Sequence, residues 1–246
     1  MLTDDYQIPL RGFTDGLAEA CHNFSRAPHP NGIVAKHISI RVLNGHSPDF
    51  QPAKNFISKA YELEFGASIE VNYPTLISVY DGCGKILAAV GLRRAGDEPL
   101  FLEQYIKQPL ESALFPFAPH DINRKAIAEL GSFATSRSSA SIYLMGATAA
   151  YLVMQKVEYA SVTATDKLVR LFGLFNFDIR VICPAQKSAL HCNDVDWGSY
   201  YDCNPQVAIG SVQQCLCSIM QCYIVRNSPA RSATLNRVIR QIWSEI

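Results

Sequence analysis

The sequence predicts an α/β fold built around one mixed β-sheet, and three observations support this. Apolar and polar side chains alternate over residues 35–43, the pattern of a half-buried strand. Two further strands, 75–80 and 86–92, flank Asp81–Gly84, a tight turn in which glycine adopts positive φ at little cost. Strand and helix patterns then alternate as far as residue 183, which predicts an antiparallel beginning and a strand–helix–strand crossover at the end.

The other elements follow from the same patterns. Pro52 fits the first turn of a helix over 52–65, because no amide hydrogen is required there. A short element at 101–114 comes after a polar break. Further strands are expected at 126–134, 158–165 and 179–183, and further helices at 142–157 and 166–175. Asp166 is expected to cap the second of these helices, because its carboxylate can accept the free amides of the first turn.

The 246 residues have room for one large domain or two small ones, and no internal repeat divides them. We expect a single domain over 1–246, with its core at 35–212. Residues 1–34 form an N-terminal extension in this scheme, and 213–246 form a C-terminal helical extension. The tail from residue 207 holds one apolar segment and then an amphipathic helix over 232–246.

Charge and hydropathy argue against several classes of function. Lysine plus arginine and aspartate plus glutamate both number 22, so the net charge is zero and the basic surface that nucleic-acid binding needs is missing. The apolar stretches 142–157 and 207–225 are interrupted by polar residues and do not reach a membrane span. No cationic segment followed by an apolar run opens the chain. We therefore expect a cytoplasmic protein with no nucleic-acid partner and no stable membrane insertion.

Three of the eight cysteines, Cys215, Cys217 and Cys222, lie close together in the sequence. Their spacing is not CxxC and no histidine is near them, so no metal site is expected. A disulfide framework is typical of small secreted chains, so we expect free, mostly buried thiols instead.

Six short runs occur in order along the middle of the chain. They are GLRRA (91–95), PLFLEQY (99–105), PLE (109–111), ELG (129–131), TAT (163–165) and WGSYY (197–201). In this order they resemble the thermostable hemolysin family over roughly residues 52–212, and the LFLEQY and WGxYY runs are the specific ones. The family usually has an asparagine and then an aliphatic residue after Glu-x-Gly, whereas this chain has Ser132 and Phe133. No role for an amide side chain at that position carries over.

The resemblance implies a GNAT-like acyltransferase fold related to the autoinducer (acyl-homoserine lactone) synthases, with two central strands that splay apart. Such proteins move an acyl group from a thioester on acyl carrier protein or coenzyme A to an amine or similar nucleophile. The implied partners are an acyl carrier protein and a small-molecule amine acceptor. The thioester is a co-substrate, and no tightly bound cofactor is expected. Residues 136–141 lack the glycines of the usual coenzyme-A-binding loop, which favours the carrier protein, and the oligomeric state stays open.

Glu129 lies in the apolar strand pattern AIAELGSFA and is the first candidate for a catalytic residue, with Glu103 as the second. Burial raises the pKa of a carboxyl group toward the range in which it accepts a proton near neutral pH. The alternative is that Glu129 forms a structural ion pair with Arg124 or Arg93.

A charged or amide group beside an aromatic ring suits the recognition of a polar acceptor. The candidates for acceptor binding are Arg93, Gln104, Tyr105, Arg124, Trp197 and Tyr201. Two alternatives stay open here. In the first, Arg93 and Glu103 only form an ion pair with each other. In the second, the WGSYY run closes the core, with Gly198 at a bulge.

The acyl donor is expected between the two splayed strands, at residues 129–136 and 160–165. Its phosphate is expected near the amides of residues 136–141, where a helix begins whose dipole favours an anion. The candidates for donor binding are Phe133, Ala134, Thr135, Ser136, Arg137, Thr163 and Thr165. The alternative is a capped helix that binds no ligand.

Two other functions compete with acyl transfer. The family name suggests a membrane-active lytic protein, which should show an exposed amphipathic segment, and only residues 232–246 offer one. The other is a GNAT-like binding module without catalytic activity, because a fold does not fix a reaction.

Overall fold

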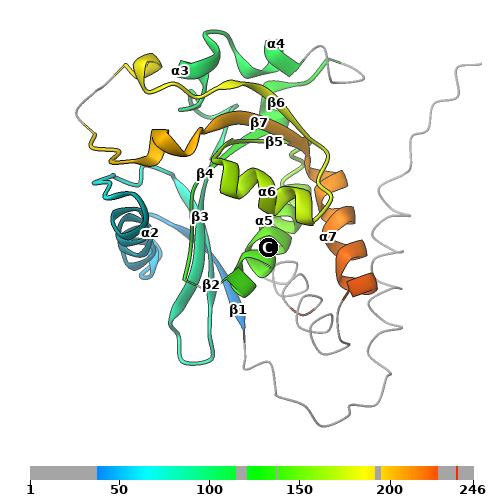
Figure 1. Ribbon diagram of the computed structural model, residues 1–246. Helices are drawn as coiled ribbons and strands as arrows, with labels where there is room; N and C mark the ends of the chain where they lie inside the picture. Colours follow the sequence, from blue (N-terminus) through cyan, green and yellow to red (C-terminus); the bar gives the residue numbers. More distant parts are fainter. Residues whose placement is uncertain (1–37, 115–120, 137, 192–194, 227–236, 238–246) are drawn as a thin grey trace, which may run out of the picture.

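The computed structural model describes residues 38–114, 121–136, 138–191, 195–226 and 237. Within them, strands form one sheet in the order β1-β2-β3-β4-β5-β7-β6 (Figure 1). The strands are β1 Ser39–Asn44, β2 Thr75–Tyr80, β3 Ile86–Arg94, β4 Ile127–Thr135, β5 Tyr159–Ala164, β6 Ile179–Pro184 and β7 Gln206–Ser211. The pair β4–β5 is parallel and all other neighbouring strands in this sheet are antiparallel. The predicted α/β class with a mixed sheet is confirmed.

Helices cover both faces of the sheet (Figure 1). One face carries α2 (Phe50–Phe65), and the other carries α5 (Ser138–Met154), α6 (Asp166–Leu174) and α7 (Val212–Arg226). Two short helices, α3 (Glu103–Ile106) and α4 (Leu110–Leu114), lie at one end of the sheet. Short 3₁₀ turns occur at Arg124–Ala126, Lys187–Ala189 and Tyr200–Cys203.

The elements predicted between residues 38 and 183 are present, with ends that differ by a few residues. The apolar segment 207–225, to which the sequence patterns assigned no element, contains most of a strand and most of a helix, because β7 ends at Ser211 and α7 begins at Val212. The strand β7 lies between β5 and β6, and its Val207, Ala208 and Ile209 are at most 2% exposed. A strand buried on both faces shows no alternation, so its sequence merges with that of the apolar helix after it.

Two predictions concern the N-terminus of α6 and a helix near the C-terminus. Asp166 does not cap α6, because Thr165 is the N-cap residue and Asp166 is the first helical residue. Its carboxylate instead accepts a hydrogen bond from the side-chain amide of Asn204, at 3.3 Å. The amphipathic helix predicted over 232–246 lies outside the described residues, apart from Arg237.

The central strand β4 presents different residues to the two helical layers. Ala128 and Leu130 pack in the core that includes α5, whereas Ile127 packs in a core on the other side. Successive strand side chains point to opposite faces, so Glu129 and Gly131 face away from α5. This is the side that carries α2.

The strands β4 and β5 separate after a short paired segment. Their register runs from Ile127↔Tyr159 to Leu130↔Val162, whereas β4 continues to Thr135 and β5 to Ala164. The register between β4 and β3 also shifts just beyond this point, where Ser132 has a positive φ of 53°. An irregularity of this kind bends a strand and changes the direction of its backbone groups. The splayed central pair therefore opens immediately after Leu130.

Candidate active site

A cleft of about 660 Å³ occupies the gap between β4 and β5. It runs from the α2 side of the sheet, where Tyr61 and Phe65 line it, to α6 on the other side. The predicted donor-binding residues that line it are Phe133, Thr135, Ser136, Thr163 and Thr165. Ala134 is 4% exposed and packs in the core beside α2, and Arg137 lies outside the described residues.

An apolar cavity of about 90 Å³ adjoins this cleft, between the sheet and the helices α5, α6 and α7. Cleft and cavity share the lining residues Gly131, Phe133, Val162 and Leu168. None of the residues that line the cavity carries a charge at neutral pH. Its polar lining groups include Thr148, whose hydroxyl has no partner among the described residues. The cavity therefore suits a hydrocarbon chain.

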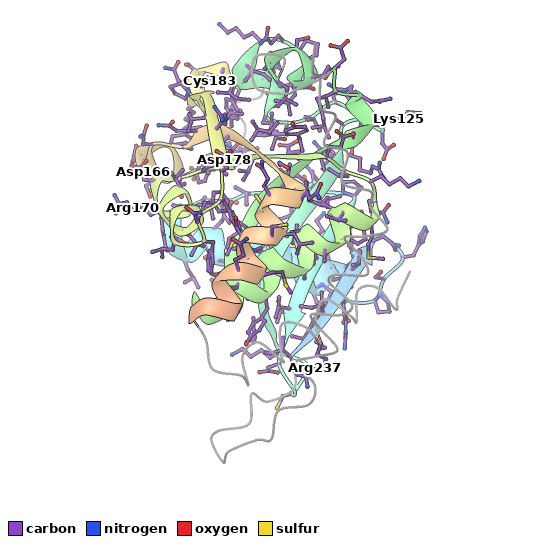
Figure 2. All side chains as sticks on the ribbon, turned by 90° about the vertical axis from the view of Figure 1, so that its right-hand side faces the viewer. Lys125, Asp166, Arg170, Asp178, Cys183 and Arg237 are labelled. Carbon is purple, nitrogen blue, oxygen red and sulfur yellow. The ribbon has the colours of Figure 1, made fainter. Side chains whose placement is uncertain are left out.

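Charged side chains stand at the rim of the cleft. Lys167 Nζ of α6 lies 2.6 Å from Glu64 Oε1 of α2, and this ion pair joins two walls of the cleft. Asp166 and Arg170 lie along the same helix (Figure 2). Lys167 is 81% exposed, so the ion pair adds little to stability in water and can exchange for another anion.

Glu129 is 2% exposed, and its carboxylate is held by three hydrogen bonds. The backbone amide of Phe101 donates to Oε2 at 2.8 Å, and that of Leu102 donates to Oε1 at 3.2 Å. The hydroxyl of Tyr73 donates to Oε1 at 3.4 Å. Burial raises the pKa of Glu129 to about 7, although the amides and the nearby charge of Arg93 act to lower it. Glu129 is thus a carboxyl group that can gain or lose a proton near neutral pH.

The alternative, a structural ion pair between Glu129 and Arg124 or Arg93, is not found among the ion pairs of the described residues. Arg124 binds Glu103 and Glu111, each at 2.6 Å. Arg93 lies 3.0 Å from Glu98. The other alternative, a pair between Arg93 and Glu103, is also absent from the ion pairs of the described residues.

Glu103 holds the segment that binds Glu129. Its carboxylate accepts from the amides of Leu100 at 3.1 Å and Leu110 at 2.9 Å, and from two guanidinium nitrogens of Arg124. Burial alone would raise the pKa of Glu103, but Arg124 and the two amides outweigh it and lower the pKa below its usual value. The segment 100–110 is therefore fixed at both ends, and the amides that point at Glu129 lie inside it.

The predicted acceptor residues divide into two groups. Tyr105 and Tyr201 share a hydrogen bond of 2.7 Å between their hydroxyls, and Trp197 packs against Tyr201 with ring centroids 5.8 Å apart. Gln104 instead joins two loops, since it donates to the carbonyl of Phe101 and accepts from the amide of His191. Arg124 likewise belongs to the carboxylate network described above.

Gly198 lies in a turn and not at a bulge. It has a positive φ of 50°, and a Cβ atom there would overlap the carbonyl oxygen of Phe65. The amide of Ser199 donates to that same carbonyl at 2.8 Å. The WGSYY run is thus docked on the end of α2, beside the cleft.

Tyr73 is a site residue that the sequence patterns did not reveal. Its ring lies across Gly91 and Gly131, which oppose each other in neighbouring strands, and a Cβ atom at either glycine would overlap the ring. The guanidinium carbon of Arg93 lies 5.2 Å from the ring centroid. Glycine inside a strand often marks the close approach of another group, and the two glycines were the available signal.

The candidate site thus combines a cleft, an adjoining apolar cavity and a buried carboxyl group. The family model described as thermostable hemolysin matches residues 43–216. The chain belongs to the thermostable hemolysin family. No curated protein matches this hemolysin-family chain in sequence.

Solved structures resemble this family member in fold. A coenzyme-A-dependent acyl-homoserine lactone synthase, BjaI with MTA, has a TM-score of 0.54 at 12% identity, over 82% of this chain and 99% of that one. FeeM, an N-acyl amino acid synthase from uncultured soil microbes, has a TM-score of 0.52 at 17% identity, over 73% and 93%. The synthase LasI has a TM-score of 0.50 at 12% identity, over 72% and 91%. The expected likeness in fold to acyl-homoserine lactone synthases is confirmed.

Three further observations concern membrane spans, metal-binding clusters and the cysteines. None of the described helices has the length and apolarity required to cross a bilayer. The described residues contain no cluster of three side chains suited to a metal ion. The cysteines Cys83, Cys183, Cys203, Cys215 and Cys217 are free, as expected. Four of them are partly buried, whereas Cys83 is exposed, so the expectation of a buried thiol is wrong for Cys83.

Proposed function

We propose that this member of the thermostable hemolysin family is an acyltransferase, which moves an acyl group from a pantetheine thioester to a small amine. The observation that carries the proposal is the place of Glu129. This carboxyl group, with a pKa of about 7, lies two residues before Gly131, where the cleft passes between β4 and β5. The similarity in fold to synthases that form acyl-homoserine lactones and N-acyl amino acids supports the same reaction class.

The two spaces fit the two halves of an acyl thioester. An extended pantetheine arm can lie in the cleft, because the edges of β4 and β5 beyond Leu130 and Val162 no longer pair with each other and offer backbone hydrogen bonds. The acyl chain enters the apolar cavity that the cleft adjoins. Lys167 and Arg170 at the rim, together with the amides that begin α5, attract the phosphate.

An acyl carrier protein is the proposed source of the thioester. Residues 136–141, SRSSAS, contain none of the glycines with which coenzyme-A-binding loops approach a diphosphate. A carrier-bound arm has one phosphate, which needs fewer amides than a diphosphate does. The exposed Lys167 and Arg170 suit a single phosphate near the surface.

The reaction needs a polarised carbonyl and a base. The irregular backbone around Ser132 lies where the thioester carbonyl would sit and can donate amide hydrogen bonds to it. The carboxylate of Glu129 accepts a proton from the amine as its nitrogen attacks the carbonyl carbon. We place the acceptor on the α2 side of the sheet, bordered by Arg93, Tyr105, Trp197 and Tyr201, with Glu103 and Arg124 holding the segment that positions Glu129.

The test is an assay with one acyl group presented on acyl carrier protein and on coenzyme A, against a panel of amines, with mass spectrometry of the thioester and amide. Glu129→Gln should lower turnover at least about tenfold without loss of folding, because it keeps the shape but removes the base. Glu62→Gln, at an exposed position of α2, is the matched control and should leave turnover unchanged. A wild-type protein that consumes no thioester with any amine would indicate a binding module, and unchanged turnover in Glu129→Gln would assign Glu129 to structure.

A further inference from the structure

An acidic and a basic side chain meet across the mouth of the cleft. Glu64 of α2 and Lys167 of α6 both line the cleft, and Lys167 Nζ lies 2.6 Å from Glu64 Oε1. The side chains are 47% and 81% exposed, so both can change partners in water at little cost. The partner of the Glu64 carboxylate in the chain itself is thus an ammonium group.

Aromatic rings form the wall of the cleft beside Glu64. Tyr61, Phe65 and Tyr200 line the cleft, and their ring centroids lie 5.3 to 6.0 Å from one another. Tyr61 is 9% exposed and Tyr200 is 6% exposed, so the rings are held firmly by the core. The faces of such rings attract a cation, and their apolar area covers methylene groups.

This aromatic wall continues into the proposed acceptor site. The ring centroid of Tyr200 lies 5.4 Å from that of Trp197 and 5.3 Å from that of Tyr201. Trp197 and Tyr201 border the acceptor in the proposed function. One continuous aromatic surface therefore leads from the acceptor position to Glu64 at the mouth of the cleft.

The electrostatics of Tyr61 suit a cation at the same place. Burial, and then the negative charge of Glu64, raise the pKa of Tyr61 well above its ordinary value. The phenol is therefore neutral at neutral pH, and the negative potential of Glu64 reaches its ring. Carboxylate and ring both favour a positive charge between them.

We propose that Glu64 and the rings of Tyr61, Phe65 and Tyr200 bind a second ammonium group of the acceptor, which makes the acceptor a small diamine or polyamine. This inference rests on the proposed acyltransferase function. One nitrogen of the acceptor attacks the thioester. The methylene chain lies along the aromatic wall, and the ammonium group at its far end takes the place of Lys167 at Glu64.

The donor and this acceptor divide the resting ion pair between them. The cleft is lined by two acidic side chains, Glu64 and Asp166, and by two basic ones, Lys167 and Arg170. The phosphate of the donor, as proposed above, binds Lys167 and Arg170 and so takes Lys167 from Glu64. The carboxylate is then left without its cation, and the second ammonium group replaces it. Donor binding should therefore favour acceptor binding.

The test compares acceptors of equal length that differ only in the charge at the far end. Diamines and the matching amino alcohols are supplied with one carrier-bound acyl donor. The wild type should use the best diamine with about tenfold higher kcat/KM than its amino alcohol, the scale of one exposed ion pair together with one cation–π contact and beyond the factor of two that two equivalent amines contribute. The gain should be in KM and not in kcat, because the group lies far from the reacting atoms.

Glu64→Gln should reduce this preference to about threefold or less, because the ion pair is lost and only the contact with the rings is left. Glu62→Gln is the matched control, since it removes the same charge from a residue of α2 that pairs with Lys59 and does not line the cleft. Its preference should equal that of the wild type. A tenfold preference retained in Glu64→Gln would overturn the proposal.

A binding measurement is independent of turnover. In calorimetry with 1,5-diaminopentane and the protein without donor, Lys167→Gln should lower Kd about threefold, because its ammonium no longer competes for Glu64. Arg170→Gln removes a second cation of the cleft, one that is not the partner of Glu64, and should lower Kd less. Equal effects of the two changes would mean general charge repulsion and would overturn the exchange at Glu64.

The outcomes separate this inference from the function on which it rests. Absence of acyl transfer to any amine by the wild-type protein would refute the proposed function. An active wild type that uses diamines and amino alcohols equally well would refute the second ammonium site alone.

Discussion

The apolar cavity next to the cleft leads to a prediction about acyl chain length. Ala149 of α5 lines this cavity and is 7% exposed, so a larger side chain there projects into the space. We expect Ala149→Leu to shift the preferred donor to shorter chains. The reason is that the leucine side chain and the end of the acyl chain compete for the same volume.

The size of the shift follows from the volume that the substitution adds. Replacing alanine with leucine adds three carbon atoms to the wall of a cavity of about 90 Å³, so leucine removes room for about three methylene groups of the acyl chain. At about 0.8 kcal/mol for each buried methylene, the longest accepted donor should lose about 60-fold in kcat/KM.

The assay measures kcat/KM for a series of thioesters with four to fourteen acyl carbons, in the wild type and in Ala149→Leu. Thr148→Val is the matched control, because it changes the neighbouring lining residue without changing its volume, and its length preference should equal that of the wild type. The melting temperature of each variant shows whether the core has tolerated the change. An unaltered length preference in a folded Ala149→Leu protein would refute the placement of the acyl chain in this cavity.

Two more predictions concern Glu129 and Gly198. In the wild type, kcat/KM should rise with pH through an apparent pKa near 7, because only the ionised carboxylate of Glu129 accepts a proton; a flat profile between pH 5 and about 9 would contradict this. Burial raises the pKa of Glu129 from 4.5 to about 7, so the folded state favours the protonated carboxyl group. The stability that comes from this preference is fully present at low pH and is lost as the pH rises through 7. In urea unfolding, the free energy of unfolding of Glu129→Gln relative to that of the wild type should therefore rise by about 3 kcal/mol from pH 4 to pH 8. Gly198→Ala should destabilise the protein by about 1–3 kcal/mol through strain at positive φ and overlap with the Phe65 carbonyl, and an unchanged urea midpoint would count against that docking.

Local patterns were sufficient to predict most of the fold. The alternation in 35–43 and the glycine turn at Asp81–Gly84 depend on neighbours within a few residues, and the structure contains the corresponding strands β1, β2 and β3. The strand β7 could not be separated from the helix after it, because β7 ends at Ser211 and α7 begins at Val212, with no loop residue between them. Its position between β5 and β6 depends on pairing between distant segments, which no local pattern contains.

The site was predictable only where one residue contrasted with its surroundings. Glu129 could be identified because a carboxylate inside an apolar strand is unusual. The partners of Glu103 could not, since Arg124 and the amides of Leu100 and Leu110 come together only in the folded chain. Tyr73 was missed for the same reason, because its slot exists only when Gly91 and Gly131 lie opposite each other.

The energetics of Glu129 argue for a functional and not a structural role. Above pH 7 its buried charge costs the folded state about 3 kcal/mol relative to an ordinary carboxyl group, which is a large share of the stability of a typical domain. Among the described residues no arginine forms an ion pair with Glu129, whereas Glu103 nearby binds Arg124 and its pKa is held below the usual value. A carboxylate in this region can thus be neutralised by an arginine, and this is the case for Glu103, which holds the segment 100–110. The fold leaves Glu129 with two amides and a phenol hydroxyl, partners that orient the carboxyl group without removing its ability to take up a proton.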